Sequence, residues 1–178
     1  MDQDKLLKIQ GHMADLLASR ESVLLASTAD DGTPHASYAP VIMGDKGQYY
    51  IHISELAKHY HNLNANGRVS ALIIEDEKDA ANIFARKRLT LDGKAVKIDK
   101  ESANWNKIMD KFGVKFGEFF NQSLRKQGDF HTFELSFASG TLVLGFGAAF
   151  RLTGSELGQI DWLQGAHGQA GTGLATAK

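Results

Sequence analysis

A single histidine, His167, stands in the C-terminal stretch DWLQGAHGQAGTGLATAK, where four glycines surround it. Histidine is the side chain that changes charge near neutral pH, and its neutral imidazole is a common metal ligand. A stretch of this composition does not hold a side chain in place by itself, because chain ends are usually disordered unless something ties them down. The simplest interpretation of His167 is therefore a disordered end, which leaves its presence among the glycines unexplained.

Two further histidines, His59 and His61, lie two positions apart in the stretch AKHYHNL. On a helix this spacing points the two side chains to different faces, so they make a poor two-histidine metal clamp. The alternative for each is a structural or surface role, because histidines are often half-buried and hydrogen-bonded. The other histidines have no partner that spacing identifies, and we expect ordinary surface or core roles for His12, His35, His52 and His131.

Asp129 follows Gly128, which ends a predicted helix, and it opens a predicted strand. A carboxylate at such a point can be held rigidly and aimed, although a simple turn or cap residue also fits there. In ARKRLTLDGKA, Arg86 and Arg88 are two positions apart, so a strand would place both on one face. Two guanidinium groups on one face can bind an anionic ligand together, whereas exposed arginines on strands are otherwise solvated.

Gly145 and Gly147 enclose a phenylalanine within a predicted strand. Glycine in a strand indicates a β-bulge or close backbone packing, and the alternative is a flat ligand that approaches the bare backbone. The sequence contains no Walker-type loop, no G-x-S-x-G element, no H-E-x-x-H motif and no C-x-x-C pair. The common sequence signatures of phosphate loops, serine hydrolases and zinc sites are therefore missing.

The elements that position these residues follow from hydrophobic periodicity and turn residues. Apolar residues at helical spacing predict a first helix over 2–20, and the stretch 22–54 predicts three strands in an antiparallel meander. A short helix in 55–66 ends at Asn66 and Gly67, and Ser102 is the N-cap of a long helix that ends near Gly128. The remaining strands are expected in 68–77, 88–99, 129–137 and 140–154.

The long helix carries a wide apolar stripe of Trp105, Ile108, Met109, Phe112, Phe116, Phe119 and Phe120. About six strands, most of them joined by tight turns, and three helices favour an α+β fold in which helices pack outside an antiparallel barrel. We expect one domain over 1–163, with the first helix included, and a flexible tail over 164–178.

Composition excludes several classes of protein. The 178 residues carry a formal net charge of -1 with an isoelectric point near 6.6, and no dense cluster of Lys and Arg stands out, so nucleic acid is not expected as a partner. No cysteine occurs, which excludes disulfides and thiolate metal sites and suits a reducing compartment. The N-terminus is charged from its second residue and no stretch is long and apolar enough to cross a bilayer. We therefore expect a cytoplasmic protein without a membrane partner.

Four stretches together resemble a known superfamily: LLASTADDGTPHASYAPVI, YYIHISELAKHYHNLNANGRVSALIIEDE, IFARKRLTLDG and LVLGFGAAFRLTG. They are similar to the pyridoxamine-phosphate-oxidase-like, FMN-binding proteins, whose fold is an antiparallel split β-barrel, and the resemblance spans roughly residues 20 to 155. SELAKH, IFARKRLT, the strand that contains GFG and the glycine-flanked C-terminal histidine resemble more closely the bacterial haem-utilisation proteins of the HugZ/HutZ type.

The departures from the flavin-binding pattern point the same way. FMN-binding relatives commonly carry Lys or Arg where this chain has His59, and that cation holds the flavin phosphate. A neutral or partly charged imidazole is a poorer phosphate anchor than a fixed cation. His61 stands where an arginine is frequent among relatives, and Gly67 replaces the usual proline after this helix.

The resemblance to the haem-utilisation proteins gives the tail histidine a role. It implies that His167 is the axial ligand of the haem iron and that Asp129 accepts a hydrogen bond from its other ring N–H. It also implies that Arg88, and less directly Arg86, lie near the haem propionates or the distal side. His59 would lie near the haem edge, while the strand with Gly145 and Gly147 would offer bare backbone to the macrocycle.

The implied function is haem binding and oxygen-dependent haem degradation to a biliverdin-like product, with release of iron for use by the cell. The alternatives are haem storage or delivery without turnover, an FMN-dependent oxidoreductase on the same fold, and a barrel that serves only as an interaction scaffold. The implied partners are haem as ligand and substrate, an electron donor, and a second copy of the chain in a homodimer.

Overall fold

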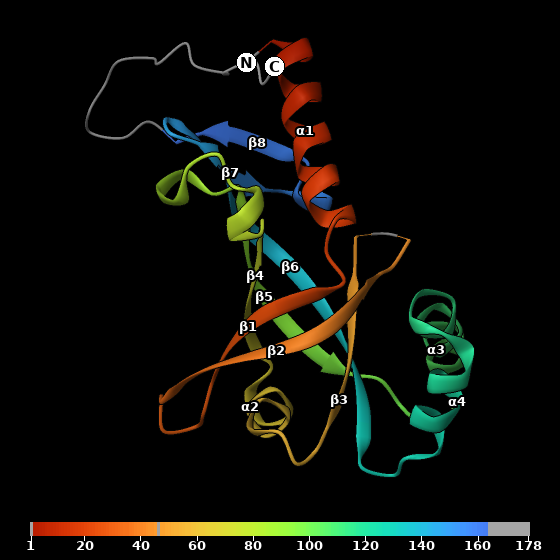
Figure 1. The fold of residues 1–178 in the computed structure, drawn as a ribbon. Helices are drawn as coiled ribbons and strands as arrows, with labels where there is room; N and C mark the ends of the chain where they lie inside the picture. Colours follow the sequence, from red (N-terminus) through yellow and green to blue (C-terminus); the bar gives the residue numbers. More distant parts are fainter. Residues whose placement is uncertain (1, 46, 164–178) are drawn as a thin grey trace. The chain divides into compact units, whose positions relative to one another are not determined.

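The computed structural model describes residues 2–45 and 47–163. Their contacts divide them into two compact units (Figure 1). The unit that we call the barrel unit comprises Glu21–Ala71 and Asp92–Phe137. The second, the terminal unit, comprises, among the described residues, 2–20, Leu72–Leu91 and 138–163.

Six strands form a closed antiparallel barrel, as the sequence predicts. In order of pairing they are β3 (Tyr49–Ser54), β2 (Pro34–Met43), β1 (Ser22–Thr28), β4 (Arg68–Ile74), β5 (Arg88–Lys97) and β6 (Phe130–Gly145). The barrel closes because β3 pairs with β2 on one side and with β6 on the other. The end of β4, the beginning of β5 and the end of β6 belong to the terminal unit, where β7 (Ala148–Thr153) and β8 (Gln159–Trp162) continue the sheet.

Alternation of side chains explains the strands at the start of the barrel. In β1, Val23, Leu25 and Ser27 are buried while Leu24 and Ala26 between them are exposed. A strand sends successive side chains to opposite faces, so this pattern places one face of β1 against the core. Five of the six residues of β3 are buried, which fits a strand that has neighbours on both sides.

The first two helices agree with the sequence-based predictions. Helix α1 (Gln3–Ala18) begins at Asp2, whose side chain accepts a hydrogen bond from the Lys5 N–H. It buries Ile9 and Leu16, and Figure 1 shows it beside β8 in the terminal unit. Helix α2 (Lys58–Asn66) ends at Gly67, whose φ of 66° is left-handed, the conformation that glycine adopts most easily.

The predicted long helix over 102–128 is wrong, because the chain forms two helices there. Helix α3 (Ala103–Phe116) begins at Ser102 as predicted, and α4 (Glu118–Lys126) follows after Gly117, whose φ is 100°. The apolar stripe does not continue into α4: Phe119 and Phe120 are 92% and 58% exposed. The buried residue of α4 is Asn121.

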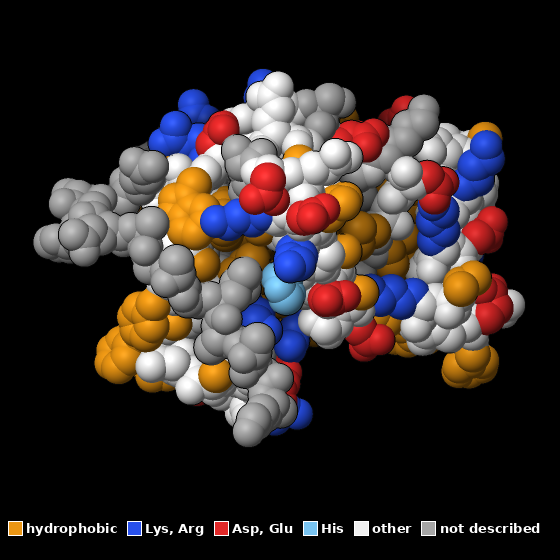
Figure 2. All heavy atoms as spheres, turned by 90° about the horizontal axis from the view of Figure 1, so that it is seen from above, with side chains coloured by type: hydrophobic (Ala, Val, Ile, Leu, Met, Phe, Trp, Pro, Cys, Tyr) orange, Lys and Arg blue, Asp and Glu red, His pale blue; other side chains and the backbone are white. Residues whose placement is uncertain are grey.

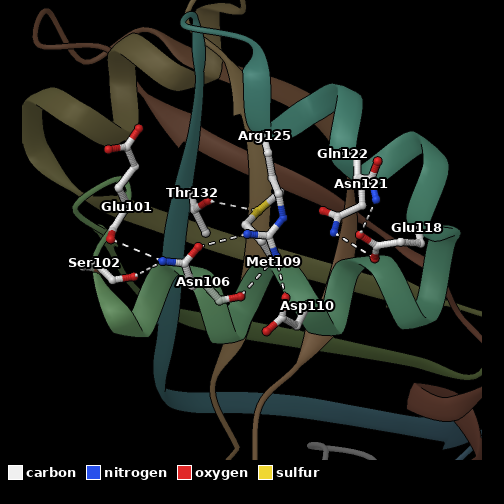
Figure 3. A network of polar contacts seen from close by, with 10 residues as sticks. All are labelled: Glu101, Ser102, Asn106, Met109, Asp110, Glu118, Asn121, Gln122, Arg125 and Thr132. Carbon is white, nitrogen blue, oxygen red and sulfur yellow. Dashed lines mark hydrogen bonds and ion pairs between the residues drawn. The ribbon is translucent and has the colours of Figure 1, made fainter.

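Polar contacts hold the two helices against each other (Figure 3). The Arg125 guanidinium donates hydrogen bonds to the Asn106 side chain at 3.0 Å and to the Asp110 carboxylate at 2.6 Å. The same guanidinium lies 5.3 Å from the centre of the Trp105 ring, which is a cation–π distance. The contacts of Arg125 thus attach α4 to α3, whereas Phe119 and Phe120 of the predicted apolar stripe remain exposed.

Two strands form over 129–154 as predicted, but the predicted boundary between them, at 138–139, is wrong. Strand β6 runs without interruption to Gly145, and the turn that ends it lies at Gly145–Gly147. Gly140 looks like a separator in the sequence, but a Cβ there would lie 2.8 Å from the Leu91 Cδ2 atom and the Thr90 carbonyl oxygen. Its role is close packing against β5. Strand β8 has no counterpart among the predicted elements.

Three short 3-10 turns complete the described chain: Glu77–Asp79, Ile83–Ala85 and Ser155–Leu157. On the face drawn in Figure 2, acidic and basic side chains are mixed, and neither sign forms one continuous area. Within 2–45 and 47–163, no helix has both the length and the apolar content needed to cross a membrane.

Candidate functional site

Asp129 lies immediately before β6, and its carboxylate is held from the end of β3. The Ser54 hydroxyl donates a hydrogen bond to Asp129 Oδ2 at 2.9 Å. The backbone is fixed as well, because the Glu55 N–H donates to the Asp129 carbonyl oxygen at 2.7 Å. The other carboxylate oxygen, Oδ1, accepts no hydrogen bond from the part of the chain that the structure describes. Asp129 is therefore a half-buried acceptor with a fixed orientation and one open oxygen.

His131, two residues further along β6, contacts the same segment of chain. Its Nε2 lies 3.1 Å from Glu55 Oε2, and its ring stacks on the Tyr60 ring at a centroid distance of 4.8 Å. Lys97 lies beside this group, since its Nζ lies 3.4 Å from the Tyr60 hydroxyl oxygen. We call Ser54, Glu55, Tyr60, Asp129 and His131 the Asp129 cluster. It combines two carboxylates, an imidazole and a phenol at one end of the barrel unit.

His59 is a buried side chain of α2, only 9% exposed, while His61 two residues later is exposed. The predicted difference in direction is confirmed. Burial lowers the pKa of His59, and the nearby His35 lowers it further, so the imidazole is neutral at pH 7. Its Nε2 is buried and has no hydrogen-bond partner within the described residues. A neutral imidazole in this position cannot serve as the fixed cation that a phosphate group requires.

In the terminal unit, the predicted arginine pair does not share a strand face. Strand β5 begins at Arg88, so Arg86 lies outside it, at the end of a 3-10 turn. The Arg86 guanidinium donates to the Glu75 carbonyl oxygen through Nε and Nη2 and to Glu77 Oε1 through Nη1. Arg88 donates only through Nη1, to the Arg86 carbonyl oxygen at 3.1 Å, so most of its N–H groups have no partner in the described chain. Of the two, Arg88 is the one that can still bind an anion.

Gly145 is the last residue of β6, and Gly147 lies in the turn that leads to β7. The register of the two strands shifts between Val143 and Gly145, as the bulge interpretation predicts. Close backbone packing is wrong for these glycines, because a Cβ at either position would meet no described atom within 4 Å. Phe146 between them is 70% exposed. The turn therefore presents bare backbone and an aromatic ring.

His167 lies outside the described residues. Within 2–45 and 47–163, no group of three or more His, Cys, Asp or Glu side chains is placed to hold a metal ion. The candidate residues within the described chain thus offer the oriented carboxylate of Asp129, the buried imidazole of His59 and the guanidinium of Arg88, but no metal centre of their own.

Sequence reasoning found Asp129 but missed the residues that hold it. Ser54 and Asp129 are 75 positions apart, and His131 and Glu55 are 76 apart, so no local spacing connects them. The one local signal is the two-residue interval between Asp129 and His131, because a strand over 129–137, as predicted, would place both on one side. Sequence reasoning also gave no sign that His59 would be buried.

Comparison with known proteins agrees with this fold. Residues 9–144 match the family described as pyridoxamine 5'-phosphate oxidase. The chain is 35% identical to heme oxygenase HutZ of Vibrio cholerae, over 97% of this chain and 100% of that protein.

Two solved structures are similar as well. The crystal structure of HutZ from Vibrio cholerae, described there as a heme storage protein, has a TM-score of 0.69 and 35% identity, with 72% of this chain and 89% of that chain covered. The crystal structure of Campylobacter jejuni ChuZ has a TM-score of 0.80 and 28% identity, with 92% of this chain and 66% of that chain covered. The chain therefore belongs to the pyridoxamine 5'-phosphate oxidase family and, within it, to the proteins of the HugZ/HutZ type.

Proposed function

We propose that this protein binds haem and degrades it, with oxygen and an electron donor, to a biliverdin-like product and free iron. Haem is then both ligand and substrate, and it supplies the iron and the ring on which the chemistry takes place. The chain's own residues bind and orient it. The observation that carries the proposal is the Asp129 carboxylate, which is fixed through Oδ2 and leaves Oδ1 available as an acceptor.

In this proposal His167 is the axial ligand, and Asp129 accepts the hydrogen bond from its second ring nitrogen. A carboxylate acceptor fixes the tautomer and the orientation of a ligating histidine and raises its donor strength. The described residues fit such a group, because an oriented acceptor with one open oxygen is what a ligating imidazole needs beside it. The relative named heme oxygenase HutZ supports haem as the ligand.

Other contacts with haem are proposed from the resemblance together with the local chemistry of each residue. Arg88 has N–H groups without a partner among the described residues, and these suit a propionate, whereas Arg86 is engaged by Glu75 and Glu77 and is the weaker candidate. Gly145 and Gly147 leave their backbone uncovered, which suits a flat ring. His59, neutral and buried, would lie near the haem edge.

A haemin titration of the purified protein and of His167→Ala tests the proposal. We expect a Soret band in the wild type that is shifted, weakened or lost in the variant, because the iron loses its protein ligand. His12→Ala is the matched control, since it removes a histidine of α1 that makes no hydrogen bond in the described chain. Equal spectra in the wild type and His167→Ala would contradict the assignment.

A second prediction concerns turnover. Asp129→Asn keeps a side chain of the same shape but removes the charge that orients and polarises His167. We expect haem still to bind, while degradation with ascorbate and oxygen slows about 10- to 100-fold. The rate is followed by the loss of the Soret band. Full activity in Asp129→Asn would refute the role of this carboxylate.

Haem storage without turnover is the second candidate, favoured by the description of the solved HutZ structure as a heme storage protein. The reaction with reductant and oxygen separates the two functions. An FMN-dependent oxidoreductase is disfavoured by the neutral, buried His59 at the position of the phosphate anchor. We further propose that the protein is a cytoplasmic homodimer, as is typical of split barrels of this kind.

A further inference from the structure

We propose that the outer face of α3 and α4, which we call the hairpin face, binds the surface of an anionic bilayer. Both helices lie within the barrel unit. Binding of this kind takes place among the lipid head groups, so it needs no helix that spans the membrane. It goes beyond the proposed function, and it differs from the expectation of no membrane partner, which considered only segments that cross a bilayer.

Three large apolar side chains are exposed around the corner between the two helices. Val114 of α3 is 90% exposed, and Phe119 and Phe120 of α4 are 92% and 58% exposed. Gly117, with its φ of 100°, turns the chain between them. Val114 also lines a hollow beside Met43 of β2, so the apolar surface extends from α3 to that strand. Exposed apolar side chains gathered in one place mark an interaction site.

The two helices are held together largely without these phenylalanine rings. Asn121 is the buried residue of α4, Leu124 packs against the apolar cluster beneath α3, and Arg125 bonds to side chains of α3. Phe119 and Phe120 lie in the first turn of α4 and stay mostly outside this contact. Removal of an aromatic ring from water is favourable, so both rings would gain from a surface outside the chain.

The charge of the hairpin face is opposite to that of the rest of the chain. Residues 103–126 contain five basic and two acidic side chains, a net charge of +3. The other 15 basic and 19 acidic residues of the chain give -4. Three of the basic residues recur every four positions, so they lie along one side of α3: Lys107, Lys111 and Lys115.

Ion pairs do not cancel this excess of positive charge. Asp110 is paired with Arg125, and Lys111 is paired with Asp45 of the preceding β-strand loop. Three lysines of the hairpin face then stand against one glutamate: Lys107, Lys115, Lys126 and Glu118. The face therefore combines exposed aromatic rings with a surplus of lysines.

This combination favours a bilayer over a protein partner. Lysine is depleted in the cores of protein interfaces, whereas helices that lie on membranes combine lysines with exposed phenylalanines. A second copy of the chain seated on the same face would bring like charges together across a two-fold contact. Anionic head groups supply the opposite charge, and the boundary of the acyl chains takes up the rings.

Flotation of the purified full-length protein with lipid vesicles tests the proposal. We expect binding to vesicles of phosphatidylcholine and phosphatidylglycerol in equal parts, and little binding to vesicles of pure phosphatidylcholine. Binding should weaken as salt is added, because salt screens the attraction between lysines and head groups. Absence of binding to the mixed vesicles overturns the proposal, and so does equal binding to both kinds.

The double variant Phe119→Ser with Phe120→Ser tests the apolar part of the face. We expect its partition into mixed vesicles to fall about 10-fold or more, because two rings no longer enter the lipid boundary. Phe84→Ser is the matched control and should bind like the wild type, since Phe84 is 81% exposed but lies in the terminal unit. Should the double variant fail to fold, Phe119→Ser takes its place. Unchanged binding by that folded variant overturns the proposal.

Lys107→Gln tests the charged part. We expect its partition into mixed vesicles to fall about fivefold, the contribution of one lysine near an anionic surface. Lys8→Gln makes the same change in net charge at an exposed residue of α1 and should have little effect. Equal losses in the two variants would show that binding follows net charge and not this face. Light scattering without vesicles adds a further outcome: a dimeric wild type beside a monomeric double phenylalanine variant assigns the face to a second copy and overturns the proposal.

Discussion

Acidification from pH 6.5 towards pH 4 is expected to lower the free energy of unfolding by about 3 kcal/mol through His52 alone. His52 is a buried residue of β3, and burial is the largest cause that lowers its pKa from 6.5 to about 4. Electrostatic interactions with Lys100 and His131 also lower the pKa of His52, while a hydrogen bond with the Leu124 backbone raises it. The protonated form of His52 is therefore disfavoured in the folded state relative to the unfolded state over this range.

The contacts of the ring agree with a neutral His52. Its Nδ1 lies 2.9 Å from the Thr132 hydroxyl oxygen, and that hydroxyl donates to the Met109 sulfur at 3.8 Å. Because the Thr132 proton is used in this way, its oxygen accepts from an Nδ1–H. The Phe130 and Phe112 rings lie 5.4 and 6.1 Å from the imidazole, centre to centre. An apolar pocket of this kind holds a neutral ring and penalises a charged one.

The sign of the effect follows from proton binding. Between the two pKa values, the unfolded chain carries a proton on this histidine that the folded chain lacks. Falling pH therefore stabilises the unfolded state, and the free energy of unfolding decreases. Above pH 6.5 neither state holds the proton, and the effect vanishes.

Urea unfolding of the wild type and of His52→Leu at several pH values from 7 to 4.5 measures the contribution of His52 to the pH dependence of the free energy of unfolding. The leucine variant cannot titrate, so its stability should fall less steeply with pH, whatever its stability at pH 7. His12→Leu, a substitution in α1, should keep the slope of the wild type. Parallel curves for the wild type and His52→Leu would contradict the prediction.

Gly93→Ala is expected to destabilise the protein by about 3 kcal/mol, at the upper end of the cost of overpacking. A Cβ at Gly93 would lie 2.0 Å from the Ser136 carbonyl oxygen and 2.8 Å from the Phe137 Cα atom. Both of these are backbone atoms of β6, which cannot rotate away as a flexible side chain could. Relief would require β5 to separate from β6 within the closed barrel.

Gly11→Ala is the matched control for this substitution. A Cβ at Gly11, in the middle of α1, would meet no described atom within 4 Å. Alanine is the better helix former, so this variant should be more stable than the wild type by roughly 1 kcal/mol. Denaturant unfolding of both variants gives the comparison. A Gly93→Ala variant as stable as the wild type would show that β5 and β6 are not closely packed there.

Local signals predicted much of the fold. The turn residues and alternating strands of 22–54 predicted the meander, and Asn66 with Gly67 marked the end of α2. The break at Gly117 could not be predicted, because apolar residues recur at helical spacing on both sides of it. Gly140 was taken for a break between two strands for a related reason. The residues that require a glycine there, Leu91 and Thr90, are distant in sequence, so no local signal points to them.

The candidate site was predicted in the same uneven way. Asp129 could be singled out because it follows a glycine at the start of a strand, which is a local feature. No local sequence feature distinguishes Ser54 and Glu55. Only the pairing of β3 with β6 brings them to Asp129 and His131. The prediction that Arg86 and Arg88 share one face of a strand is wrong, because β5 begins at Arg88, two residues after Arg86.

The closure of the barrel also bears on how the protein is made. His52 of β3 and Thr132 of β6 are 80 positions apart, so the partner of β3 is synthesised well after β3 itself. At ribosomal speeds of roughly 5 to 20 residues per second, β3 waits for several seconds with β2 as its one paired neighbour. During that interval its other edge is open to pairing with a foreign strand. Barrel closure is thus a late event of biosynthesis, because β6 must be made before it can cover that edge.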